Sequence, residues 1–211
     1  MIDKNIKVTY TPEDEPYLGR ELLFHFDKMI SCCLENNSVI SKLTHKIQLT
    51  ELQKMASQVI PQSINISLSI RELIRQGYLF GAHVLKRSLI ERVVILLYIH
   101  IFPDKINLWA EGWEFRKAPS LAKMMDEIKQ HEGWELETKG YELTASLNSL
   151  VHGKPDSAFW GMVVMEDGNL GNAPSKMINS PKLCDNLCAD IVPWLVVVVS
   201  MMCAYFPEIE A

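Results

Sequence analysis

The segment Ser88–Phe102 limits the possible folds more than any other part of the chain. Its polar residues are only Ser88, Glu91, Arg92 and His100. A helix that is apolar nearly all round has to be covered on all sides by other elements. The segment is therefore predicted to be the central helix of a helical bundle.

Helical periodicity also dominates the rest of the chain. Between Tyr17 and Asn36 apolar residues recur at spacings of three and four, as in an amphipathic helix, and Asn36-Asn37-Ser38 is expected to end it. Thr50–Gln53 has the form of a capping box, so a second helix is expected to begin there. Pro61 is expected to kink or restart that helix. Further helices are expected at 63–102, with weak points at Gly77 and Gly81, at 105–117, capped by Asp104, at 121–131, capped by Ser120, and at 134–152, ended by Gly153.

Residues 153–181 have a different character, because they hold four of the ten glycines and three of the ten prolines. Within them, A-F-W-G-M-V-V-M followed by E-D-G-N is typical of a short strand and a tight turn. A segment of this length can be a lid over a site, an arm that contacts a partner, or a loop packed on the surface of the domain. The chain is thus predicted to be all-α, a single domain over 1–211 with an N-terminal arm at 1–16. It has about six to seven helices and a long loop or short β-hairpin before the last one.

The C-terminal run from Leu187 to Phe206 is almost wholly apolar. Its uninterrupted part, Ile191–Phe206, has 16 residues, which falls short of the about 20 needed to span a bilayer. We favour a buried core or interface helix that helps to form a homodimer, with a C-terminal anchor as the alternative. The polar N-terminus lacks the pattern of a secretory signal, so a cytoplasmic protein without a membrane partner is expected.

Composition narrows the function classes. A net charge of −5 gives the whole molecule no attraction to nucleic acid, so any such site has to be a local patch. The chain has no G-x-S-x-G elbow, phosphate-binding P-loop, G-x-G-x-x-G or H-E-x-x-H motif. Five cysteines without a C-x-x-C pair indicate reduced, mostly buried thiols. We expect no metal and no cofactor.

The strongest polar pattern lies in H-V-L-K-R-S-L-I-E. His83, Arg87 and Glu91 recur every four residues and so form one stripe along a helix. Because a buried unpaired charge costs several kcal/mol, Arg87 and Glu91 are expected to pair. The pair is either a core ion pair that sets helix register or a pre-organised guanidinium that binds a phosphate or another anion.

A second pattern lies in N-S-L-V-H-G. Asn148 and His152 are separated by one helical turn, and Tyr141 and Ala145 continue the same stripe, which is expected to face solvent or a polar groove. His152 near a helix C-terminus either interacts with the helix dipole or acts as a general acid or base.

Four basic residues also fall on one side of the helical stretch 63–102. They could follow a phosphate backbone, although a solvated helix edge is favoured. They are Arg71, Arg75, Lys86 and Arg92.

Three of these segments carry a resemblance. Gly77–Ile99, the following F-P-D-K and L-N-S-L-V-H-G at 147–153 resemble a bacterial family of all-helical proteins of unknown function, over roughly residues 63–155. The family's core reads R-S-L-x-E, a hydrophobic run ending in Y-I, and S/N-x-x-x-H-G. The resemblance implies a helical fold and leaves the activity open.

The chain is more distantly similar to the HEPN superfamily, whose helical bundles dimerise and often act as metal-independent ribonucleases in toxin–antitoxin and phage-defence systems. They use an R-x4-6-H motif, and His152 corresponds to its histidine. The positions where the motif has its arginine hold Leu147, Ser146 and Ala145. Arg87 of the neighbouring helix would have to replace that arginine.

Two functions follow. The first is a ligand-binding or interaction bundle of unassigned role, associated with stress or defence, with a polar site of Arg87, Glu91 and His152 and with a second copy or another protein as partner. The alternative is a HEPN-like endoribonuclease acting on RNA. In it Arg87 clamps the phosphate, His152 is the acid/base, and Asn148 and Tyr141 orient them.

Overall fold

The computed structural model describes residues 20–113, 118–133, 140–173, 177–178 and 180–209. The expected N-terminal arm at 1–16 lies outside these residues, as does 134–139 of the helix expected at 134–152. The described α-helices are α1 (Glu21–Thr44), α2 (Glu51–Arg75), α3 (Leu79–Ile101), α4 (Ile106–Ala110), α5 (Leu121–Glu132), α6 (Gly140–Val151) and α7 (Pro181–Tyr205). Short 3-10 helices are η1 (Pro103–Lys105), η2 (Pro155–Gly161) and η3 (Pro207–Ile209), and the strands are β1 (Met162–Val164) and β2 (Leu170–Asn172).

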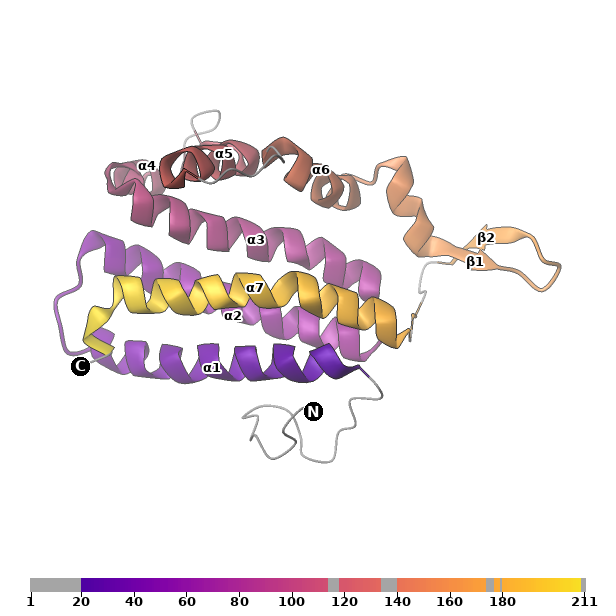
Figure 1. Ribbon diagram of the computed structural model, residues 1–211, viewed down its shortest axis with the longest axis horizontal. Helices are drawn as coiled ribbons and strands as arrows, with labels where there is room; N and C mark the ends of the chain where they lie inside the picture. The colour runs from indigo at the N-terminus through magenta and orange to yellow at the C-terminus, as the bar shows by residue number, and fades with distance from the viewer. Residues whose placement is uncertain (1–19, 114–117, 134–139, 174–176, 179, 210–211) are drawn as a thin grey trace.

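Four long helices, α1, α2, α3 and α7, form an elongated bundle in which α1 packs along α7 and α2 packs along α3 (Figure 1). α4, α5 and α6 lie over the outer side of α3. As a result α3 contacts α2, α5, α6 and α7, which confirms the central position predicted from its composition. The all-α class, the number of helices and the hairpin before the C-terminal helix are also confirmed.

Helix ends agree with the sequence where a capping side chain is present. The Thr50 hydroxyl accepts from the Gln53 backbone N–H at 3.2 Å, and Gln53 Oε1 accepts from the Thr50 N–H at 3.1 Å, so the predicted capping box forms. Ser120 caps α5, which ends at Gly133 in the left-handed conformation (φ 66°). The predicted role of Asp104 is wrong, because it lies within η1 and the helix after it, α4, has only five residues.

Two predicted helix breaks are absent. α1 continues through Asn36, whose side-chain Nδ2 donates to the Cys32 carbonyl at 2.9 Å and so is satisfied within the helix. α2 likewise continues through Pro61, so the helix does not restart there. The break in the long stretch 63–102 falls at Gly77, where φ is 82°, whereas Gly81 lies inside α3. A positive φ is readily adopted only by glycine, which explains why the chain turns there.

The hairpin projects from the end of the bundle, beyond η2 (Figure 1). β1 and β2 pair antiparallel, with Val163 opposite Gly171. The predicted strand is therefore shorter than its apolar run, because Phe159 and Trp160 belong to η2. Val164 and Leu170 are 73% and 65% exposed, so the arm has almost no core of its own.

α7 is the apolar C-terminal helix, and it is long and apolar enough to cross a membrane by length and composition. In the bundle it packs on α1, α2 and α3. The Tyr205 hydroxyl donates to the Leu96 carbonyl of α3 at 2.7 Å. One side of α7 is therefore buried as in a core helix, while Val196 on its other side is 48% exposed.

Candidate functional site

The predicted pair on α3 forms. Arg87 Nη1 lies 2.9 Å from Glu91 Oε2, one helical turn away. The Arg87 side chain is 19% exposed and that of Glu91 is 42% exposed. The guanidinium is therefore mostly covered, whereas the carboxylate reaches solvent, and the pair is not a fully buried core ion pair.

Arg87 also connects the two sequence patterns. Its Nε donates to Asn148 Oδ1 of α6 at 3.2 Å. The guanidinium is thus held by oxygen acceptors on two different helices, α3 and α6. The third guanidinium nitrogen of Arg87, Nη2, makes no hydrogen bond to the residues that the structure describes. A planar guanidinium held at two nitrogens has a defined orientation, as recognition of an anion requires.

The other two hydrogen-bonding residues of the α6 stripe, His152 and Tyr141, make no hydrogen bond to Arg87 within the described part of the chain. His152 follows the last residue of α6; its backbone N–H donates to the Asn148 carbonyl at 2.9 Å and its side chain is exposed. Tyr141 is 58% exposed, and its hydroxyl donates to Glu142 at 3.1 Å. The stripe therefore faces solvent except at Asn148.

His83, the first residue of the α3 stripe, packs against η2. Its ring centroid lies 4.6 Å from that of Trp160. Burial and, to a smaller extent, the positive charge of Lys86 lower the pKa of His83 to about 4, against the opposing effect of Asp190. His83 is therefore neutral at pH 7 and adds no positive charge to the Arg87 site.

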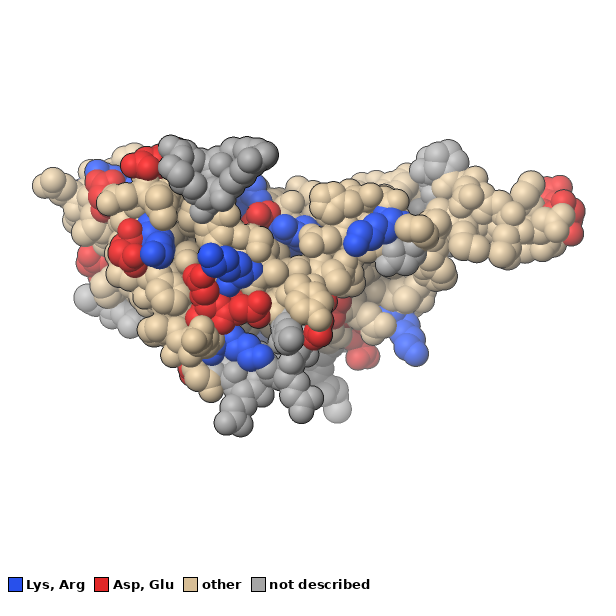
Figure 2. Space-filling model, turned by 90° about the horizontal axis from the view of Figure 1, so that it is seen from above, with Lys and Arg blue, Asp and Glu red and all other residues tan. Residues whose placement is uncertain are grey.

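The four basic residues predicted to share a helix edge do not form a free basic surface. Arg71 is buried, Arg75 Nε pairs with Glu72, and Lys86 pairs with Asp190 at 2.9 Å. Arg92 donates to Gln62 and to the Ser88 carbonyl. On the face that carries α4, α5 and α6, basic and acidic side chains are interspersed (Figure 2). These four residues therefore form neither a basic stripe that could follow a phosphate backbone nor a helix edge that is solvated throughout.

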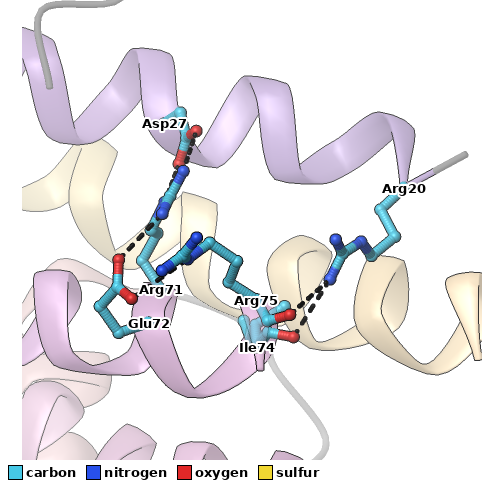
Figure 3. Close-up of polar contacts among 6 residues, drawn as sticks. All are labelled: Arg20, Asp27, Arg71, Glu72, Ile74 and Arg75. Carbon is cyan, nitrogen blue, oxygen red and sulfur yellow. Dashed lines mark hydrogen bonds and ion pairs between the residues drawn. The ribbon is translucent and has the colours of Figure 1, made fainter. Parts of the chain in front are cut away.

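A buried polar pair between α1 and α2 was not predicted. Arg71 Nε and Nη2 donate to the two carboxylate oxygens of Asp27 at 3.1 and 3.3 Å, and the side chains are 4% and 0% exposed (Figure 3). Arg71 Nη1 also donates to Glu72 at 2.9 Å. Asp27 lies off the apolar face expected for its helix. The available signal was a second set of apolar residues at helical spacing from it, Leu23, Ile30 and Leu34.

The same region anchors the beginning of α1 to the end of α2. Arg20 Nη1 donates to the carbonyls of Ile74 and Arg75 at 3.2 and 3.3 Å (Figure 3). These carbonyls belong to the last turn of α2, where the helix leaves acceptors unsatisfied. A cation is also favoured there by the helix dipole, so this contact, like the Asp27–Arg71 pair, stabilises the bundle.

Fold and polar contacts together define an all-α bundle protein with a mostly buried guanidinium between α3 and α6. The chain belongs to a family of unknown function, DUF5677, whose match covers residues 53–168. That stretch includes Arg87, Glu91 and Asn148, whereas α1 and α7, which complete the bundle, lie outside it. No curated protein and no solved structure matches the chain. The expected resemblance to a family of unknown function is thus confirmed.

Proposed function

We propose that this protein is a ligand-binding helical bundle whose Arg87 binds an anionic group, a phosphoryl or a carboxylate. The observation that carries the proposal is the position of the guanidinium, held by Glu91 on α3 and Asn148 on α6 with Nη2 left over. Because these contacts fix the side chain before a ligand arrives, little conformational entropy is lost on binding.

The neighbouring charges set the expected affinity. Glu91 neutralises much of the charge of Arg87, so a free anion has to compete with a carboxylate 2.9 Å away. His83 is neutral and gives no help. We therefore expect weak binding of simple anions, with affinity supplied mainly by the rest of a larger ligand.

Titration with inorganic phosphate, pyrophosphate and acetate, followed by isothermal calorimetry and by ¹H–¹⁵N NMR shifts, tests the proposal. Arg87→Lys keeps the charge but loses the planar fork, and Lys46→Ala, an exposed site on the α1–α2 connection, is the control. We expect binding to weaken in Arg87→Lys and to persist in Lys46→Ala. If the natural sequence binds none of these anions while Arg87→Ala only lowers the melting temperature, the site is a structural contact and the proposal is wrong.

The alternative is a HEPN-like, metal-independent endoribonuclease. It is favoured by one contact: Arg87 from the neighbouring helix meets Asn148, one turn before His152. In this hypothesis Arg87 clamps the phosphate, His152 transfers the proton, and Asn148 and Tyr141 orient them. Incubation with total RNA in EDTA tests it. Cleavage that is lost in folded His152→Ala and Arg87→Ala variants would support it, and absence of cleavage by the natural sequence would end it.

We further propose a cytoplasmic location and a role in stress or defence. We also propose a homodimer. The dimer is supported by large apolar side chains exposed on η2 and the hairpin and, separately, by one on α7, since exposed apolar surface is typical of interfaces. These side chains are Phe159, Val164, Met165, Leu170 and Val196.

A further inference from the structure

A cleft lies at the end of the bundle opposite the hairpin, where the C-terminal end of α3 meets η1, α4 and α5. Its volume is about 550 Å³, within the range of roughly 300–1,000 Å³ that small-molecule sites occupy. Its lining residues differ from those of the Arg87 site, which lies three turns earlier on α3. The cleft is thus a separate candidate site.

Aromatic rings make up a large part of the lining of the cleft. The Phe102 ring lies 5.0 Å from that of Tyr98 and 5.4 Å, edge to face, from that of His131. Trp113 adds an indole. Its backbone has φ 49°, directly after Gly112 at φ 85°. A left-handed conformation is an outlier for a bulky residue, and such outliers cluster at ligand sites.

The polar lining of the cleft holds two lysines, and the negative charges beside them are Glu127 and Asp104. The lysines are Lys105 and Lys123, and Glu127 lines the cleft with them. Glu127 Oε2 accepts from the Tyr98 hydroxyl at 2.5 Å, and Lys123 Nζ stands 3.7 Å from Oε1. Lys105 pairs with Asp104 at the rim at 2.9 Å.

The groups able to hydrogen-bond a ligand are therefore of two kinds. Lys123 is beyond hydrogen-bond distance of Glu127, so its ammonium can donate to an anion. Glu127 Oε1 can accept an N–H, and the amide of Gln130, which also lines the cleft, can donate and accept. Burial, and then the hydrogen bond to Glu127, raise the pKa of Tyr98, so its hydroxyl stays a donor and holds that carboxylate in place.

We propose that this cleft binds a nucleoside monophosphate whose base carries N–H donors. The base stacks on Phe102 and Trp113, its N–H edge faces Glu127 and Gln130, and its phosphate meets Lys105 and Lys123. Stacking on aromatic side chains tolerates any base, because each has a π face. Glu127 Oε1 adds a preference for guanine over adenine. The N1–H and N2–H of guanine are adjacent donors, whereas the N–H of adenine lies beside its acceptor N1, which a carboxylate repels.

Calorimetric titration with GMP, AMP, guanosine and ribose 5-phosphate tests both halves of the proposal, with quenching of tryptophan fluorescence as a second readout. GMP should bind more tightly than AMP, and guanosine and ribose 5-phosphate should each bind far more weakly than GMP. If guanosine equals GMP, the phosphate contact is wrong. If ribose 5-phosphate equals GMP, the base contact is wrong. If neither nucleotide binds at millimolar concentration, the site is overturned.

Variants of residues that line the cleft test whether GMP binds there. The Lys123 side chain is 66% exposed, so Lys123→Ala should fold normally and weaken GMP by about tenfold, as expected for the loss of a charge-assisted hydrogen bond. Trp113→Leu should remove the stacking contact. Lys46→Ala is the matched surface control and should bind as the natural sequence does. Unchanged affinity in Lys123→Ala and Trp113→Leu, with the melting temperatures retained, would exclude this cleft. Arg87→Ala tells the two sites apart: GMP binding that is lost in Arg87→Ala and retained in Lys123→Ala would assign the nucleotide to the Arg87 site and exclude this cleft.

Discussion

Arg87 of α3 and Asn148 of α6 are joined by a hydrogen bond of 3.2 Å across 61 residues of sequence. This contact joins the polar residues of α3 to those of α6. It uses Nε, whereas a ligand that approaches the outer end of the guanidinium binds the Nη nitrogens. Asn148 is thus placed to orient Arg87 without competing for an anion.

Asn148→Ala removes that acceptor. We expect a loss of roughly 1 kcal/mol in the free energy of unfolding, together with weaker anion binding at Arg87. Urea unfolding of the two single variants and of Arg87→Ala/Asn148→Ala gives the coupling between the residues. Strictly additive effects would show that the hydrogen bond does not contribute in solution.

The Asp27–Arg71 pair should be the most sensitive polar contact in the bundle. Asp27→Ala leaves a buried guanidinium without its carboxylate, which costs about 3–5 kcal/mol. Asp27→Leu/Arg71→Met should recover much of that loss, because apolar residues can replace a buried ion pair. Lys54→Ala is the control, since its pair with Glu51 is exposed and exposed pairs contribute about 0–1 kcal/mol. Equal losses in Asp27→Ala and Lys54→Ala would contradict this.

His83 should make the bundle sensitive to acid. Its pKa is about 4 in the folded protein against an ordinary value of 6.5, so the unfolded chain binds more protons between these values. The free energy of unfolding should therefore fall as the pH decreases from 7 to 4, by at most about 3 kcal/mol from this group. His83→Gln should flatten the curve in that window. Parallel curves for the two proteins, measured by urea unfolding, would refute the assignment.

Gly140 at the start of α6 packs directly on α5. A Cβ there would collide with the Ala122 carbonyl oxygen and lie 3.0 Å from Asp126 Oδ1, which also accepts from the Gly140 N–H at 2.7 Å. Gly140→Ala should therefore destabilise the protein by about 1–3 kcal/mol. Gly81→Ala, inside α3 and facing the flexible Leu73 side chain at 3.3 Å, should stay within about 1 kcal/mol. Thermal unfolding compares the two, and the reverse order would be inconsistent with this packing.

The hairpin should contribute to self-association. Val164→Lys and Leu170→Lys place charges on exposed apolar positions of the arm and should shift a dimer toward monomer without lowering the melting temperature of the monomer. Val39→Lys, at a half-exposed apolar position of α1, is the control. Light scattering over a concentration series measures the change. A monomer at every accessible concentration would refute the proposed dimer.

The helical class, the capping box at Thr50 and the central position of α3 could all be predicted from the sequence. They depend on residues close together in the chain: a hydroxyl and an amide three positions apart, or a run of apolar side chains with no polar face. The Arg87–Glu91 pair was predictable for the same reason, because one helical turn separates the two residues.

Contacts between distant segments were decided only by the folded chain. Arg71 was predicted at a solvated helix edge, but α1 places Asp27 against it. The hydrogen bond from Arg87 to Asn148 forms only because α6 packs on α3. The cleft beside Trp113 likewise needs the end of α3, α4 and α5 together. Local periodicity carries no information on which helix faces meet, and it is the meeting of those faces that pairs buried charges and creates a site.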